Sequence, residues 1–150
     1  MDLNTELTLI LRALLAAILG AIIGLEREIH GREAGIRTYA AVALGSCTFG
    51  LISLHAGPTI DTRIAANIVA GIGFLGAGII FKEGGRISGL TTAATIWSTA
   101  ASALAISFGM YILGVFTGVL IFALLAVHDF PFWKRFKDRL SKQEKNRENK

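Results

Sequence analysis

The side chains with the most varied chemistry gather in two short segments, 26–37 and 82–89, which hold four carboxylates and five permanent cations. Carboxylates and water are the ligands that Mg²⁺ prefers. The interleaved arginines compete for those carboxylates, so we expect salt bridges that hold the two loops in place. The helices that follow begin near Ile36 and Leu90. Their free N–H groups, together with Arg37 and Lys82, could receive an anionic group from a ligand or partner.

The three histidines, His30, His55 and His128, lie on separate segments and show no metal-ligand spacing. The sequence also contains no nucleophile–base motif, phosphate-binding loop or zinc signature. It therefore predicts no metal site, no cofactor and no enzymatic activity.

The elements that must position these charges are apolar. Hydrophobic residues make up 53% of the 150 residues and charged residues 17%, against about 45–50% and about 25% in a soluble domain. This composition excludes a disordered chain and disfavours a water-soluble enzyme. A helix needs about 20 apolar residues to cross a membrane. The runs Leu7–Leu25, Ile36–Leu54, Ile64–Phe81 and Leu90–Val127 are long enough, and the last is long enough for two helices with a turn at 107–109. We predict an all-α fold with five transmembrane helices.

Lysine and arginine are distributed unevenly in this topology. With the N-terminus outside and the C-terminus in the cytoplasm, thirteen lie on the cytoplasmic side and one, Arg63, lies outside, as the positive-inside rule requires. We expect a membrane domain over residues 1–128 and a basic cytoplasmic tail over 129–150. Trp133, Phe136 and Leu140 would share a face of this tail that anchors it on anionic lipid. The basic character follows from topology, so we expect no nucleic-acid partner.

Arg12 lies inside the first apolar run, where an arginine costs about 2.5–3.5 kcal/mol at the centre of a span. We expect it to face protein, with Asp61 or Glu6 as partners, or alternatively to extend to the outer headgroups. Small residues follow it at intervals of four, a pattern that lets another helix approach closely. They are Ala16, Gly20 and Gly24.

The third and fifth predicted helices carry glycines at close spacing. Asp61 could cap the third helix, and Arg63 and Asn67 lie on one stripe of it. Its glycines permit close helix packing, which we favour, or a local break that exposes carbonyls to an ion. These glycines are Gly71, Gly73, Gly76 and Gly78. On the fifth helix, Gly114 and Gly118 offer an interface for a homo-oligomer.

The fourth predicted helix carries a polar stripe, Thr91, Thr95, Ser98 and Ser102. We expect this stripe to form hydrogen bonds between helices, although it could line a hydrated path. The first two helical hairpins also resemble each other, with Leu-Gly-Ala ending one helix (19–21 and 75–77) and a glycine opening the next. The similarity indicates either a parallel repeat or chance in a Gly- and Ala-rich sequence.

Several strings in fixed order resemble the MgtC/SapB family of bacterial inner-membrane proteins: GLERE (24–28), AGIRT (34–38), RIAAN (63–67), GIGFLGAG (71–78) and GLTTAATIW (89–97). The resemblance covers about residues 10–127. It implies a five-helix membrane domain, a role in adaptation to low Mg²⁺ and, in pathogens, survival inside host cells. Regulation of other membrane proteins, including ATP synthase and P-type transporters, is the role that it implies.

The chain departs from the family pattern in three places. Many members carry a soluble ACT-like C-terminal domain where this chain has its basic tail, and some have Asn at Thr91 and Cys at Ser98. The candidate ligand- or partner-binding residues are those that match the pattern: Glu26, Arg37, Thr38, Asp61, Arg63, Asn67, Thr92 and Trp97. We expect Glu26 to pair with Arg37 across the first loop.

The leading hypothesis is a non-enzymatic regulator in the bacterial inner membrane that contacts other membrane proteins within the bilayer. The alternative is a Mg²⁺ transporter or channel, which would need a homo-oligomer because five helices are few for a pore. A structural subunit of a larger membrane complex is a third reading.

Overall fold

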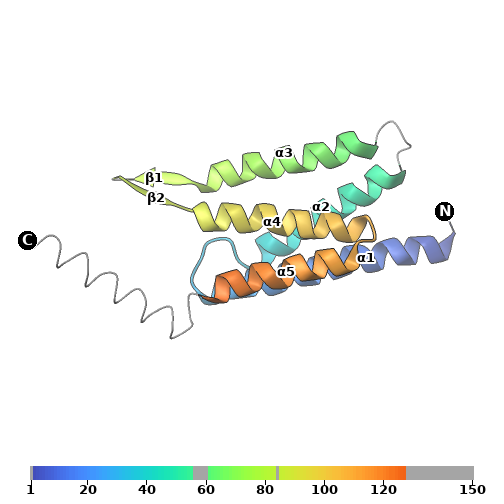
Figure 1. Ribbon diagram of the computed structural model, residues 1–150, viewed down its shortest axis with the longest axis horizontal. Coiled ribbons are helices and arrows are strands. Elements are labelled where there is room, and N and C mark those ends of the chain that lie inside the picture. The colour runs from blue at the N-terminus through green and yellow to red at the C-terminus, as the bar shows by residue number, and fades with distance from the viewer. Residues whose placement is uncertain (1, 56–60, 84, 128–150) are drawn as a thin grey trace, which may run out of the picture.

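The computed structural model describes residues 2–55, 61–83 and 85–127. Within these ranges the chain forms five α-helices and one two-stranded hairpin, shown in Figure 1. In chain order they are α1 (Leu3–Ile29), α2 (Ile36–His55), α3 (Asp61–Ile79), β1 (Phe81–Glu83), β2 (Arg86–Ser88), α4 (Leu90–Ser107) and α5 (Tyr111–Ala126). The predicted all-α class is confirmed. The predicted tail, 129–150, and His128 lie outside the described residues.

Local chemistry explains where these helices begin and end. Asp2 caps α1 and accepts a hydrogen bond from the Thr5 N–H at 3.3 Å. Hydrogen bonds from the Thr5 hydroxyl and N–H also lower the pKa of this carboxyl. This cap explains why α1 starts four residues before the apolar run. The predicted division of 90–127 is correct, since α4 ends at Ser107 and Gly109 makes the turn with a φ of 79°.

The segment predicted as a charged loop, 82–89, instead forms most of a β-hairpin. Phe81 lies opposite Ser88 and Glu83 opposite Arg86. Gly85 has a φ of 82°, which a tight hairpin turn requires. The segment is too short and too interrupted by glycine for a helix, and pairing the two strands satisfies its backbone groups.

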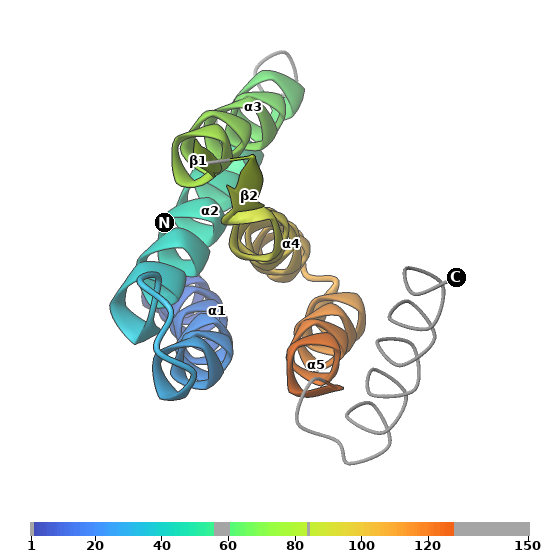
Figure 2. The same ribbon diagram turned by 90° about the vertical axis from the view of Figure 1, so that its left-hand side faces the viewer.

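The helices form an array in which α4 is central (Figure 2). The α1–α2 pair is the most extensive contact, and α4 packs against all four other helices. Helix α3 lies at one edge, against α2 and α4, and α5 lies at the opposite edge, against α4 and α1. Consequently α3 presents much of its surface away from the rest of the chain.

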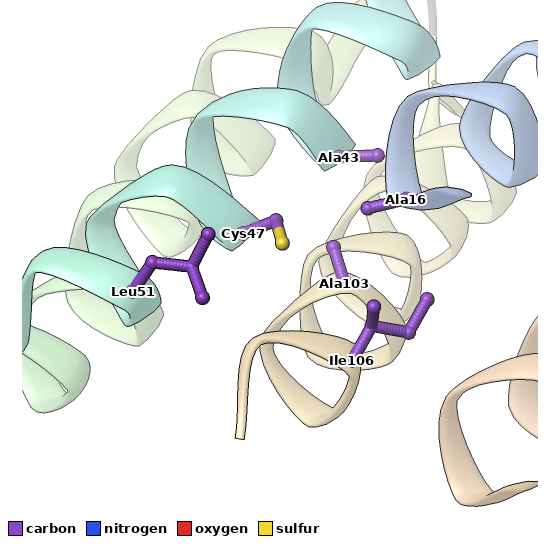
Figure 3. Packing of buried hydrophobic residues seen from close by; sticks show 6 residues of the cluster. All are labelled: Ala16, Ala43, Cys47, Leu51, Ala103 and Ile106. Carbon is purple, nitrogen blue, oxygen red and sulfur yellow. The ribbon is translucent and has the colours of Figure 1, made fainter. Parts of the chain in front are cut away.

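The core is built of small side chains. One cluster joins α1, α2 and α4 through Ala16, Ala43, Cys47, Leu51, Ala103 and Ile106 (Figure 3). Large apolar side chains face outward instead: Phe74 is 85% exposed and Ile112 is 89% exposed. Small residues inside and large apolar residues outside are typical of helices packed in lipid.

Two helices, Leu3–Ile29 and Ile36–His55, are long and apolar enough to cross a membrane by length and composition. Arg63–Ile79 and Tyr111–Ala126 are shorter apolar helices. The predicted count of five spans therefore stays a prediction.

The small-residue stripe of α1 packs inside the chain. A Cβ added at Gly20 would lie 2.5 Å from the Tyr39 carbonyl oxygen, and one at Gly24 would lie 2.7 Å from the Gly35 carbonyl oxygen. The stripe thus serves the α1–α2 contact, and it is not free for a partner helix.

The other glycine candidates divide into two groups. A Cβ at Gly114 or Gly118 would meet Ile106 or Leu19 at 2.5 Å, so this pair packs within the chain and is not the free oligomer interface that we expected. Gly71, Gly73 and Gly78 have open space around them. Gly71 and Gly78 share one face of α3 and Gly73 lies on a nearly opposite one, and none of the three is covered by the described residues.

The two helical hairpins cross in a similar way. Gly20 of α1 meets the backbone of Tyr39, the fourth residue after Gly35, and a Cβ at Gly76 of α3 would lie 3.6 Å from the Cβ of Ala93, the fourth after Gly89. In the repeat suggested by the sequence, these positions are equivalent. The geometry is consistent with that repeat.

Candidate functional site

A buried ion pair ends α1 at the end of the bundle that carries the β-hairpin. The Arg27 Nε donates to Glu26 Oε2 at 2.6 Å and its Nη2 donates to Glu26 Oε1 at 3.0 Å. Both residues are buried, and His30 Nδ1 lies 3.2 Å from Glu26 Oε1 and 2.8 Å from the Glu26 carbonyl oxygen. Glu26 therefore contacts both Arg27 and His30 at the end of α1.

The expected Glu26–Arg37 pair is wrong. Arg37 is exposed in the first turn of α2 and takes part in no ion pair within the described part of the chain. The reason is that Arg27 lies three residues after Gly24, on the buried face of α1. Its guanidinium therefore lies beside the Glu26 carboxylate and occupies both of its oxygens. Glu28 instead crosses to α2, where its carboxylate accepts a hydrogen bond from the Ile36 N–H at 3.0 Å.

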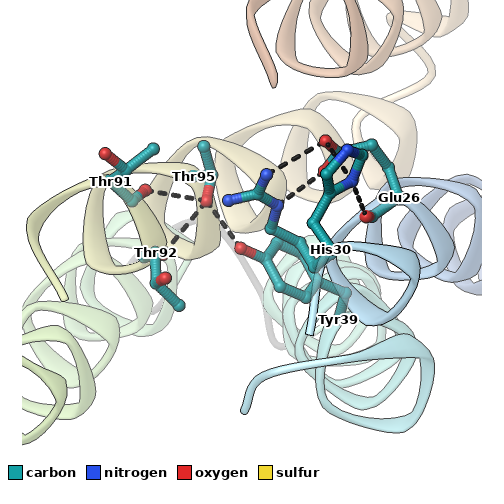
Figure 4. A network of polar contacts seen from close by, with 7 residues as sticks. Glu26, His30, Tyr39, Thr91, Thr92 and Thr95 are labelled. Atoms are coloured by element: carbon teal, nitrogen blue, oxygen red, sulfur yellow. Dashed lines mark hydrogen bonds and ion pairs between the residues drawn. The ribbon is translucent and has the colours of Figure 1, made fainter. Parts of the chain in front are cut away.

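A second polar contact ties α2 to α4 beside this pair. Tyr39 is fully buried, and its hydroxyl lies 2.6 Å from Thr95 Oγ1 (Figure 4). Thr95 Oγ1 is within 2.9 Å of the Thr91 carbonyl oxygen and 3.1 Å of the Thr92 carbonyl oxygen. A carbonyl can only accept, so Thr95 donates to the backbone and the Tyr39 hydroxyl donates to Thr95. The expected bonds between helices are confirmed for Thr95 and for Ser102, which donates to the Gly114 carbonyl oxygen of α5 at 2.7 Å, whereas Ser98 donates to Ala94 within α4.

A pocket of about 610 Å³ opens next to the ion pair. Its walls come from the end of α1, the following loop, β2, the start of α4 and the end of α5. The lining residues are Glu26, Arg27, His30, Arg32, Ile87, Ser88, Gly89, Leu90, Thr91, Thr92, Leu124, Leu125 and Val127. The lining combines polar side chains with leucine, isoleucine and valine side chains.

The structure brings two of the eight predicted site residues, Glu26 and Thr92, to this pocket. Arg37 and Thr38 lie at the same end of the bundle, on the first turn of α2, without lining the pocket. Arg63 is exposed near the start of α3. Asp61 begins α3, and its side chain lies outside the described residues.

The last two predicted site residues line separate hollows. Asn67 lines a groove of about 570 Å³ between α2 and α3, which also contains Ser46, whose buried hydroxyl has no hydrogen-bond partner among the described residues. Trp97 is 48% exposed and lines a hollow of about 270 Å³ between α3 and α4. The eight residues therefore do not form one site.

Sequence reasoning did not select three residues that the structure brings together here, Arg27, His30 and Tyr39. A usable signal existed for Arg27, because intervals of four and three from Gly20 and Gly24 keep it on the buried face of α1. His30 lies four residues after Glu26, the spacing at which helical side chains meet.

Arg12 marks the other end of the bundle. Its Nε donates to the Tyr111 hydroxyl at 2.7 Å, its Nη1 donates to the Ser107 carbonyl oxygen at 2.9 Å, and its Cζ lies 5.4 Å from the Tyr111 ring centroid. The expectation that it faces protein is confirmed. Its described partners lie at the α4–α5 turn, and Glu6 is not among them.

The comparison with known proteins settles the family. Residues 13–130 match the model of the MgtC family. The chain belongs to the MgtC family. It is 56% identical to "Protein MgtC" of Brucella abortus (strain 2308) over 87 residues, which are 57% of this chain and 37% of that protein. No solved structure matches this MgtC-family chain.

Two further relatives extend the match. "Protein MgtC" of Salmonella typhimurium (strain LT2) is 49% identical over 102 residues, covering 68% of this chain and 44% of the relative. The Escherichia coli (strain K12) protein named "Putative magnesium transporter YhiD" is 41% identical over 133 residues, covering 82% of this chain and 62% of the relative. The chain thus aligns with only about 37–62% of the length of these relatives. Family and apolar exterior together identify a membrane protein.

Proposed function

We propose that this chain is a non-enzymatic, multi-pass protein of the bacterial inner membrane that regulates other membrane proteins during adaptation to low magnesium or stress. Family membership supports the connection with magnesium. The large apolar side chains that cover the exterior support a role exerted within the bilayer. Its five helices span the membrane, with the N-terminus outside and the C-terminus in the cytoplasm, and the distribution of Lys and Arg supports this orientation.

One observation favours regulation over transport. The carboxylate of Glu26 is buried among the helices, and both of its oxygens accept hydrogen bonds from Arg27. A cation as strongly hydrated as Mg²⁺ needs carboxylate oxygens that are free to replace some of its waters, and an arginine in a two-bond pair competes with it directly. Because both of its oxygens are already engaged at the end of α1, this carboxylate is poorly suited to binding a passing ion.

The geometry indicates α3 as the surface for a partner helix. Its glycines Gly71, Gly73 and Gly78 have open space around them, and Phe74 between them is 85% exposed. Small residues on an outward face allow a second helix to approach closely. The stripe of α1, by contrast, is already covered by α2. The partner is another membrane protein or a second copy of this chain.

Two experiments, one in liposomes and one in cells, distinguish transport from regulation. The purified full chain in liposomes should produce no Mg²⁺ flux above protein-free liposomes. Complementation of a deletion strain in low-Mg²⁺ medium should fail with Gly71→Leu, which fills the open face of α3. It should succeed with Ala123→Leu, which places the same side chain at an exposed position of α5.

The alternative function is a Mg²⁺ transporter or channel, and the name of the Escherichia coli relative supports it. A flux that rises with the amount of protein in the liposomes, and that is retained in Gly71→Leu, would favour transport over the proposal.

A further inference from the structure

The pocket beside Glu26 and Arg27 has two chemically different walls. Among the lining residues, Arg27, Arg32, Thr91 and Thr92 are polar and are called the polar wall, and Leu90, Leu124 and the other aliphatic side chains are called the apolar wall. Leu90 is 55% exposed and Leu124 is 72% exposed, so the apolar wall opens onto the outer surface of the bundle. A ligand that fills this pocket needs a polar group and an apolar chain in the same molecule.

The polar wall is positively charged. Arg27 is 6% exposed, yet only its Nε and Nη2 have partners, so its Nη1 has no hydrogen bond among the described residues while the side chain lines the pocket. The charges of Glu26 and Arg27 compensate each other. Among the described residues that line the pocket, Arg32 therefore leaves one uncompensated positive charge. The wall provides donors and positive charge for an anion.

The start of α4 contributes further donors to the same wall. Gly89 precedes α4 in the left-handed conformation, and within the described part of the chain no side chain caps the helix. The first N–H groups of a helix lack partners within it and favour anions. At the start of α2 this requirement is met by Glu28, which accepts from Ile36. At α4, Thr91 and Thr92 line the pocket, and no carboxylate of the described residues takes that place.

We propose that this pocket binds an anionic phospholipid. The phosphate lies against Arg32, the free Nη1 of Arg27 and the start of α4, and an acyl chain lies along Leu90 and Leu124. A soluble phosphate would satisfy the polar wall but would leave the apolar wall uncovered, and an acidic peptide has no long apolar chain to cover it. The proposal rests on the membrane location of the chain and is independent of its regulatory role.

The test measures binding of short-chain phosphatidylglycerol to the full chain purified in neutral detergent. Phosphatidylcholine of the same chain length, inorganic phosphate and a hexaglutamate peptide serve as competitors. Arg32→Gln removes a pocket charge, and Arg86→Gln removes an exposed arginine from the neighbouring strand β2 without touching the pocket. Both variants change the net charge equally, so only a specific site separates them.

We expect phosphatidylglycerol to bind and the three competitors to displace it at least tenfold less well. Arg32→Gln should weaken binding about tenfold, the effect of losing one charge-assisted hydrogen bond, and Arg86→Gln less than about twofold, which is the size expected when a distant exposed charge is removed. Leu124→Asn should weaken the binding of phosphatidylglycerol and leave any binding of inorganic phosphate unchanged.

Three results would overturn the proposal. If Arg32→Gln and Arg86→Gln weaken phosphatidylglycerol binding equally, the lipid is attracted to surface charge alone. Equal competition by inorganic phosphate would mean a phosphate site without lipid, and stronger competition by hexaglutamate would mean a peptide site. None of these results bears on regulation, which the complementation experiment tests separately.

Discussion

Glu26 and Arg27 are adjacent in the sequence, and their side chains form a buried ion pair with two hydrogen bonds, of 2.6 and 3.0 Å. Neighbouring residues on a helix normally point in different directions. Here both side chains are buried, and both line the pocket between the end of α1 and the start of α4. The pair therefore neutralises two buried charges within the last turn of α1.

Removing either partner should destabilise the protein strongly. Glu26→Gln leaves the Arg27 charge buried without compensation, and Arg27→Gln does the same to Glu26. Breaking a buried pair in this way costs about 3–5 kcal/mol. We expect each single variant to lower the free energy of unfolding in detergent by about that amount, and the double variant to lose less than the sum.

The control for this cycle is Arg37→Gln. Arg37 is an exposed arginine at the same end of the bundle, so its loss should change the free energy of unfolding by no more than about 1 kcal/mol. If the Glu26→Gln and Arg27→Gln losses add without coupling, or if Arg37→Gln couples to Glu26→Gln, the pairing described here is wrong.

The order and ends of the helices could be predicted from the sequence because apolar runs and turn residues are local signals. The turn at 107–109 follows from a run too long for one span, and α2 begins and ends within a residue of its predicted bounds. The hairpin at 81–88 was not predicted, because its three-residue strands are too short for a hydrophobic period to be visible.

The site could be predicted only in part, because the partner of a charge depends on which helix faces meet. Glu26 was singled out correctly as a residue next to an apolar span, but the choice among Arg27, His30 and Arg37 needed the direction of each side chain. Likewise, the sequence indicated that the glycines of α1 pack closely, while the identity of the covering helix, α2, is a property of the fold.

Glycine-to-alanine substitutions should separate the covered stripe of α1 from the open face of α3. In Gly20→Ala the added Cβ would lie 2.5 Å from the Tyr39 carbonyl oxygen and 2.7 Å from the Ala43 Cβ, so the two helices must separate. Such overpacking costs about 1–3 kcal/mol, and thermal unfolding in detergent should show the loss.

Gly71→Ala is the matched control, because a Cβ there meets nothing within 4 Å. Alanine favours a helix over glycine by about 0.5–1 kcal/mol, so this variant should be equally stable or more stable than the wild type. A Gly71→Ala variant that is destabilised as much as Gly20→Ala would show that α3 is covered in the isolated protein.

Reporter fusions should test the proposed topology. Reporters fused after residues 30, 86 and 150 should give a cytoplasmic signal, because Lys and Arg residues next to these positions hold them in the cytoplasm. A reporter fused after residue 58 should give a periplasmic signal. The decisive position is 86, in the β-hairpin between α3 and α4. A periplasmic signal there would contradict the five-span topology.

The contact between Arg12 and Tyr111 should stabilise the packing of α1 against the α4–α5 turn. Tyr111→Phe removes the hydroxyl that accepts from Arg12 Nε at 2.7 Å and keeps the ring, whose centroid lies 5.4 Å from Cζ. Since Tyr111 is 41% exposed, we expect a loss of about 0.5–1.5 kcal/mol in the free energy of unfolding.

Arg12→Lys should cost at least as much as Tyr111→Phe, although it keeps the charge. A lysine ammonium lacks the planar fork that lets Arg12 donate to Tyr111 and to the Ser107 carbonyl at the same time. Arg63→Lys, at an exposed position of α3, supplies the comparison and should leave stability unchanged within about 0.5 kcal/mol. If Arg12→Lys is as stable as Arg63→Lys, then Arg12 contributes only charge, and its bonds to the α4–α5 turn do not hold that turn against α1.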